Sequence, residues 1–328
     1  MKKQIITLLI YFLPLPILLA SVLIGPSETV TPESIFNLIF NNSDNTNMIQ
    51  SVIFDVRLPR ILLTFLVGGS LAISGCSIQA IFRNPLTDSY ILGLSSGAAF
   101  GAALALAWSI LPLQASAFIF GLIAVGLSYF MARKNKNVSI VSLILSGIIV
   151  SGIFTALLTL VQFYSDPFKL QSIVHWTMGN LHNANWEKLK SSVISIVVGV
   201  VVLFIYRWRL NVLALGDDEA RTVGINPEKD KAIILIASTL AASSAVAVAG
   251  IIGLYGLIVP HMVRMIIGPN NQQSIPVNFL FGGMFLLVID DFSRSLSGFE
   301  IPIGVFTMFL GAPFFIFLMK KTSIGWNS

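Results

Sequence analysis

Charged side chains are scarce in this chain, so the few that interrupt its apolar stretches are the first candidates for chemistry. Asp290 and Arg294 lie four residues apart near the end of one apolar stretch, a spacing that lets them pair along one face of a helix. Asp291 lies about 100° around the same helix and can face its neighbours. A charge inside a long apolar segment is costly to keep there, which makes it a functional candidate. A neutralised pair near the surface is the alternative interpretation.

Other reactive patterns are missing from the sequence. It contains no Ser-His-Asp set, no HExxH pattern and no phosphate-binding loop. His175 and His182 are seven residues apart with no nearby cysteine, which fits no metal-ligand spacing. No isolated Asp, Glu or Lys interrupts the middle of another apolar stretch, as an ion-coupled carrier usually requires. We therefore expect no enzyme activity, no metal site and no cofactor in this chain, and an ion-coupled secondary transporter is the less favoured alternative.

Composition defines the class of protein. The 328 residues are 55% hydrophobic and 11% charged, with a mean hydropathy of +0.85, whereas a soluble domain carries about 25% charged residues. The net charge of +5 is scattered between apolar stretches, which argues against nucleic-acid binding, and the single Cys76 excludes an internal disulfide. These features predict an all-α polytopic membrane protein, with residues 1–328 as one transmembrane domain in a lipid bilayer.

Ten apolar stretches approach the length of about 20 residues that a membrane-spanning helix needs. They cover residues 5–24, 61–82, 90–111, 113–132, 139–162, 190–206, 232–249, 250–267, 277–297 and 301–319. Frequent Gly, Ser and Ala predict closely packed helices, and the alternation typical of barrel strands is absent. The stretch 250–267 contains Gly253, Gly256 and Pro260, which predict a broken helix.

The basic residues predict the orientation of these stretches. If both termini lie inside, fourteen of the 20 lysines and arginines fall on the cytoplasmic side and six on the outer side, as the positive-inside rule expects. Arg57, Arg60 and Arg294 are then on the outer side. A long inner loop covers 207–231, where Asp217, Asp218 and Glu219 precede Gly224 and predict a helix of about two turns. This helix is either a capped connector or a docking site for a cytoplasmic partner.

Several long motifs resemble the FecCD-type permeases, the membrane subunits of ABC importers for iron–siderophore complexes, haem and cobalamin. The similarity begins in the RLPR motif at 57–60 and extends through 102. It recurs in WTMGNL at 176–181, LGDDEARTVGI at 215–225, GLYGLIVPHMVR at 253–264 and FEIPIGVFTMFLGAPFF at 299–315. Small departures occur at Ser89, Leu254 and Tyr255, none of which falls in the motifs discussed next.

The resemblance implies a ten-span fold with cytoplasmic termini, in the cytoplasmic membrane of a bacterium or archaeon. It also implies a homodimer with a second permease subunit, two cytoplasmic ATPase subunits that bind ATP and Mg, and an extracytoplasmic substrate-binding protein. The implied cargo is a metal chelate, with iron–siderophore as the leading expectation and haem, cobalamin or molybdate as alternatives.

Two sets of residues acquire expected roles from the same resemblance. Arg57, Arg60 and Arg294 match the arginines that dock the binding protein, where guanidinium groups suit carboxylate partners, and Asp290 is expected to hold Arg294. The ATPase-coupling loop matches the inner loop, and its expected residues are Gly216, Asp217, Asp218, Glu219, Ala220, Arg221, Val223 and Gly224.

Overall fold

The computed structural model describes residues 2–25, 30–34, 46–134, 137–296 and 300–321. Its helices are α1 (Lys2–Phe12), α2 (Pro14–Leu23), α4 (Thr46–Ser51), α5 (Leu58–Phe82), α6 (Leu94–Trp108), α7 (Leu113–Ala132), α8 (Ile140–Tyr164), α9 (Pro167–Thr177), α10 (Trp186–Leu215), α11 (Asp217–Thr222), α12 (Pro227–Ala249), α13 (Tyr255–Ile267), α14 (Asn271–Ser295) and α15 (Ile303–Lys321). A π-helical turn at Val52–Arg57 joins α4 to α5, a 3-10 turn covers Ser89–Leu92, and strands β1 (Arg133–Lys134) and β2 (Asn137–Val138) pair antiparallel. The predicted all-helical class is confirmed.

The apolar stretches coincide with helices of two lengths. Among the described residues, six helical runs are long and apolar enough to cross a membrane: 47–82, α7, α8, α10, α12 and α14. The other four predicted stretches fall on shorter apolar helices, which are α2, α6, α13 and the described part of α15. The short α2 follows α1 almost without interruption, since Ile17 N donates to Leu13 O and Leu13 N to Leu9 O.

Two helical runs extend beyond their predicted bounds. The run through α5 begins at Thr46 instead of residue 61, and α10 covers Trp186–Leu215 instead of 190–206. Thirty residues of helix are about 45 Å long, which exceeds the roughly 30 Å of hydrocarbon in a bilayer. Apolar length predicts only the part within the hydrocarbon, so the polar ends of these helices were missed.

The predicted break in 250–267 is present. Helix α12 ends at Ala249, and Gly250 (φ 71°) and Leu254 (φ 61°) turn the chain before α13 begins at Tyr255. The broken segment is packed in protein: Asn180 N donates to Ala249 O at 2.8 Å, and a side chain on Gly179 would collide with Ile251 O. Irregular backbone at this depth is tolerated because neighbouring backbone groups satisfy it.

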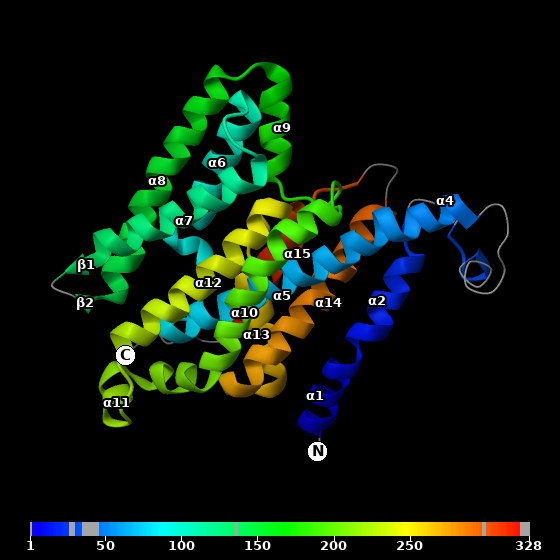
Figure 1. Ribbon diagram of the computed structural model, residues 1–328. Helices are drawn as coiled ribbons and strands as arrows, with labels where there is room; N and C mark the ends of the chain where they lie inside the picture. Colours follow the sequence, from blue (N-terminus) through cyan, green and yellow to red (C-terminus); the bar gives the residue numbers. More distant parts are fainter. Residues whose placement is uncertain (1, 26–29, 35–45, 135–136, 297–299, 322–328) are drawn as a thin grey trace.

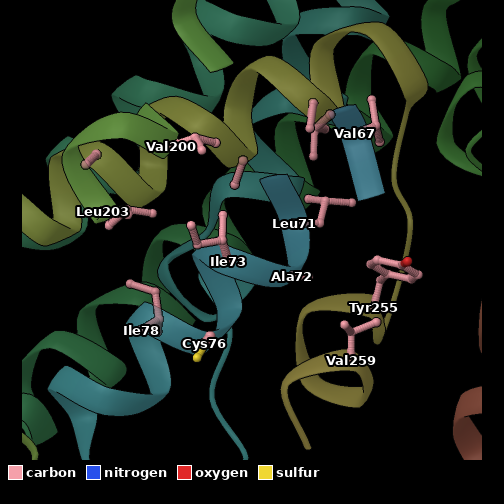
Figure 2. Close-up of a cluster of buried hydrophobic side chains, with 14 of the residues drawn as sticks. Val67, Leu71, Ala72, Ile73, Cys76, Ile78, Val200, Leu203, Tyr255 and Val259 are labelled. Carbon is pink, nitrogen blue, oxygen red and sulfur yellow. The ribbon is translucent and has the colours of Figure 1, made fainter. Parts of the chain in front are cut away.

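Helix α5 lies at the centre of the bundle and packs against α10, α12, α13 and α14 (Figure 1). Figure 2 shows the side chains of its core face together with those of α10 and α13, among them Val200, Leu203 and Tyr255. On one side α6, α7, α8 and α9 pack together, while α1 and α2 lie against α14 on the other. The N-terminus and α11 lie at the same end of the molecule (Figure 1).

Glycines let the backbones of α5 and its neighbours approach closely. A Cβ on Gly68 would lie 2.4 Å from Gly282 O of α14, and a Cβ on Gly75 would lie 2.0 Å from Gly256 O of α13. Both obstacles are backbone atoms that cannot rotate away. These contacts are the reason why small residues are needed along α5.

We predict that Gly75→Ala destabilises the bundle strongly, because its new methyl group forces α5 and α13 apart. Overpacking of this kind costs about 1–3 kcal/mol or more. The matched control is Gly152→Ala on α8, where nothing lies within 4 Å of an added Cβ. Unfolding midpoints of the purified chain measure both variants, and equal midpoints would contradict the packing described here.

Candidate functional site

The first candidate site is a cluster of buried arginines at the end of the bundle opposite α11. Arg60 of α5 donates two parallel hydrogen bonds to the Asp290 carboxylate of α14. Its Nε donates to Oδ2 at 2.9 Å and its Nη2 to Oδ1 at 2.7 Å. Its Nη1 also donates to Glu300 Oε1 at 2.8 Å. Such a bidentate ion pair is stronger than a single hydrogen bond between neutral groups. It therefore stabilises the packing of α5 against α14.

The predicted pair between Asp290 and Arg294 is therefore wrong. Asp290 is fully buried and faces α5, and its carboxylate accepts hydrogen bonds from the Arg60 guanidinium of that helix. Arg294 instead pairs with Asp291, three residues away on α14. Spacing along one helix allowed the i,i+4 pair, but the neighbouring helix supplied a partner of better geometry for Asp290.

The other two arginines hold the end of α2. Arg294 Nη2 donates to Ser21 O at 2.9 Å, and Arg57 Nη1 donates to Val22 O at 2.5 Å. Ser21 in turn donates through Oγ to Asp291 Oδ2 at 2.6 Å. The last carbonyls of a helix have no partner within it and carry partial negative charge, so guanidinium donors stabilise them. Nothing in the sequence indicated Ser21 or Asp291 as partners.

The structure brings Arg57, Arg60 and Arg294 to the same end of the bundle and buries them. Their exposed fractions are only 3%, 6% and 3%. The sequence predicts an outer position for all three arginines, but residue types alone do not reveal that their guanidinium groups turn inward.

A surface histidine extends the arginine cluster. His182 Nδ1 lies 3.2 Å from Glu300 Oε2, and the His182 side chain is 59% exposed. Burial raises the pKa of Glu300, but its hydrogen bonds and charge interactions with Arg60 and His182 outweigh burial and lower that pKa below the ordinary value. Glu300 thus stays ionised as a bridge between α5 and the loop after α9. Its role was not apparent from the sequence.

The second candidate site is the short helix α11, which confirms the helix predicted in the inner loop. Three acidic residues occupy its first turn, and Gly224 follows its end with a φ of 79°. Ile225 N donates to Ala220 O and Gly224 N to Arg221 O, the paired bonds of a Schellman motif. Gly216 precedes the helix at φ 157° and ψ 165°, a region occupied almost only by glycine.

Ion pairs fix α11 against the rest of the bundle. Lys231 of α12 lies 2.5 Å and 2.7 Å from the two Asp217 carboxylate oxygens, and Arg83 beyond α5 lies 4.0 Å from Asp217. Arg221 donates to Asp218 at 3.0 Å and to Glu228 at 2.5 Å. The hydrogen bond and charge interaction with Glu228 raise the pKa of Arg221.

An ion pair between an exposed arginine and a buried aspartate joins the two helices that flank α11. Arg209 of α10 donates through Nη1 to both carboxylate oxygens of Asp230 at 2.8 Å and 2.9 Å, and Asp230 is 1% exposed. This pair ties α10 to α12 beside the point where α11 lies between them. Within the described residues, no three His, Cys, Asp or Glu side chains gather as a metal ion would require.

An all-helical bundle with several membrane-length helices, buried ion pairs at one end and a braced surface helix at the other is a multi-pass membrane protein of the permease class. The chain belongs to the FecCD transport family, whose model matches residues 11–321. This family comprises the transmembrane permease subunits of ABC importers, in which separate subunits carry the ATPase.

Individual relatives support the same membership. The chain is 41% identical to the molybdate import system permease protein MolB of Haemophilus influenzae, over 84% of this chain and 83% of the relative. It is 37% identical to a protein of Helicobacter pylori described as a probable iron chelatin transport system permease, over 86% of each. A solved structure described as an inward-facing metal-chelate type ABC transporter has a TM-score of 0.85 and 36% identity, and covers 95% of this chain and 98% of that one.

We predict that Arg60→Gln is strongly destabilising, because it leaves the Asp290 carboxylate buried without its partner, at a cost of about 3–5 kcal/mol. Replacing both residues by leucine is expected to cost less than the sum of the single Arg60→Leu and Asp290→Leu changes. The control is Asp218→Asn, which removes an exposed ion pair that contributes about 0–1 kcal/mol. Unfolding midpoints test the set, and equal losses for Arg60→Gln and the control would contradict it.

Proposed function

We propose that this chain is the permease subunit of an ABC importer that moves a metal chelate, most directly an iron–siderophore complex, across the cytoplasmic membrane of a bacterium or archaeon. The observation that carries the proposal is membership of the FecCD family over residues 11–321, together with the structural likeness to a metal-chelate type transporter at 36% identity. ATP is hydrolysed in separate subunits, and this chain binds no cofactor of its own.

The proposed topology has ten crossings with both termini in the cytoplasm. In the described part of the chain, six long and four shorter apolar helices are available for these crossings. The N-terminus and α11 lie at one end (Figure 1), and with this end inside, fourteen of the 20 basic residues face the cytoplasm. The arginine cluster then lies at the outer end.

The proposed coupling element is α11 with its flanking glycines, residues Gly216, Asp217, Asp218, Glu219, Ala220, Arg221, Val223 and Gly224. It is a compact helix that protrudes between α10 and α12 and is braced by ion pairs to α12. A rigid element of this kind can pass movement of two ATPase subunits to the membrane helices of a permease homodimer. No titratable group in the transport path is then required.

The proposed docking site for an extracytoplasmic binding protein is the outer end around Arg57, Arg60 and Arg294, with Asp290 in support. All three arginines are buried and bonded within the protein. Docking therefore requires that they exchange inner acceptors for carboxylates of the partner. The arginine cluster thereby links the bound partner to α2, α5 and α14.

The substrate is tested directly by the metal content of cells that lack this permease. Such cells are supplied in turn with ferric siderophores, haem, cobalamin and molybdate, with and without a complementing copy. Molybdate is included because MolB, which is 41% identical to this chain, is described as a molybdate import permease. Loss of iron from a siderophore alone, restored by complementation, is the expected result. Normal accumulation of every compound, also in a multiple-transporter knockout, would contradict the importer.

We predict that Gly216→Ala uncouples ATP hydrolysis from transport. Alanine at φ 157° and ψ 165° is strained. Its Cβ meets only the Glu219 carboxylate, which can rotate away, so relief of the backbone strain is what shifts α11 from its place between α10 and α12. Uptake is expected to fall at least about tenfold, equivalent to roughly 1.4 kcal/mol, while ATPase activity persists. The control is Gly268→Ala, a positive-φ glycine at a helix end outside the coupling loop. Normal uptake in Gly216→Ala would exclude this role for α11.

We predict that Arg57→Glu weakens docking of the binding protein, because it reverses a charge at the proposed docking site. The loss of affinity is expected to be largest at low salt, where screening is weakest. Lys190→Glu controls for the charge change alone, since it makes the same reversal at an exposed residue near the start of α10, whereas Arg57 is buried. Affinity of the purified binding protein for each variant is the measurement, and equal losses would show only a general effect of charge.

A further inference from the structure

An apolar groove runs between α7 and α12 on the face of the bundle. Its lining includes Leu122, Val125 and Gly126 of α7 and Leu235, Ile236 and Thr239 of α12, and its volume is about 180 Å³. The Thr239 hydroxyl donates to Leu235 O at 2.7 Å, so its donor is already used. Ile236 is 67% exposed, which leaves the groove open to its surroundings.

A second cavity of about 270 Å³, lined in part by residues of α11, adjoins the groove. Tyr129, Ala232 and Leu235 line both spaces. Apolar residues, including Ile81 and Leu143, form part of the lining of the second cavity. Four charged residues line it as well: Asp217, Arg221, Glu228 and Lys231. An apolar groove therefore lies next to a charged compartment at the α11 end of the bundle.

We propose that this pair of spaces is a binding site for one phospholipid of the leaflet on the α11 side. The part of one acyl chain nearest the glycerol fits the apolar groove of about 180 Å³ between α7 and α12, and the headgroup fits the charged compartment beside α11. Tyr129 lies at the junction, where an aromatic ring with a polar end suits the boundary between hydrocarbon and headgroup. The site goes beyond the transport function proposed above.

The charges of the compartment select the kind of headgroup. Its two acids and two bases balance each other, and they are arranged as the pairs Lys231–Asp217 and Arg221–Glu228. A headgroup with one negative and one positive group matches this pattern. For an anionic headgroup, attraction to the two bases is offset by repulsion from the two acids. The proposed lipid is therefore zwitterionic, as phosphatidylethanolamine is.

Gly126 keeps the groove open. A Cβ added there meets nothing within 4 Å, so a larger side chain fills the groove without colliding with the fold. Gly152 of α8 is also exposed and free of neighbours, and it lies outside the groove. The two glycines thus provide a blocking variant and a matched control.

Native mass spectrometry of the purified full-length chain, released from bilayers of phosphatidylethanolamine and phosphatidylglycerol, tests the site. Gly126→Leu is expected to lose one retained phosphatidylethanolamine per chain, and Gly152→Leu is expected to keep it. Equal lipid retention in the two variants would overturn the proposal. Loss of chain–chain association in Gly126→Leu alone would also overturn it, because the groove would then belong to a protein interface.

The headgroup assignment has its own test in Glu228→Gln, which removes one acid from the compartment and leaves it net positive. The ratio of retained phosphatidylglycerol to phosphatidylethanolamine is expected to rise severalfold in this variant. An unchanged ratio, or a preference for phosphatidylglycerol already in the unmodified chain, would overturn the zwitterionic assignment.

Discussion

The structure depends on one constraint, which is that α5 has to be enclosed by protein on nearly every side. Its helical run is 83% buried over its most apolar window, and four helices pack around it (Figure 1). Glycines supply the close backbone contacts, and its serines turn their hydroxyl groups to carbonyl acceptors, as Ser77 does to Ile73 O at 2.8 Å. The glycine contacts and the serine hydrogen bonds let a helix with polar atoms lie in an apolar interior.

This central helix connects the two ends at which chemistry is concentrated. Arg57 and Arg60 precede or begin α5 and bind α2 and α14, while Arg83 at its other end approaches Asp217 of α11. Twenty-five residues of helix span about 37 Å, which is the thickness of a bilayer core with part of its headgroup layers. A rigid helix with one end in the arginine cluster and the other beside α11 offers a direct mechanical path between them.

The sequence predicted the helices well because a bilayer requires long apolar segments. It also predicted helix ends and breaks, because single residues determine them. The break predicted within 250–267 is present at its start, although Gly256 and Pro260 lie inside α13. Three acids with Gly224 delimit α11 as predicted. The sequence could not predict which helices are enclosed: α5 and α8 are similarly apolar, yet their most apolar windows are 83% and 28% buried. It also mistook the partner of Asp290, because helical spacing says nothing about Arg60 on a neighbouring helix.

The most direct test of the account is ATP-driven uptake by proteoliposomes that contain this permease, its ATPase subunits and its binding protein. Radiolabelled ferric siderophore is supplied on the binding-protein side and ATP on the α11 side. The account predicts uptake that requires hydrolysable ATP and stops with a non-hydrolysable analogue, whatever the ion gradient. Uptake driven by a proton or sodium gradient without ATP would contradict it and would identify a secondary transporter instead.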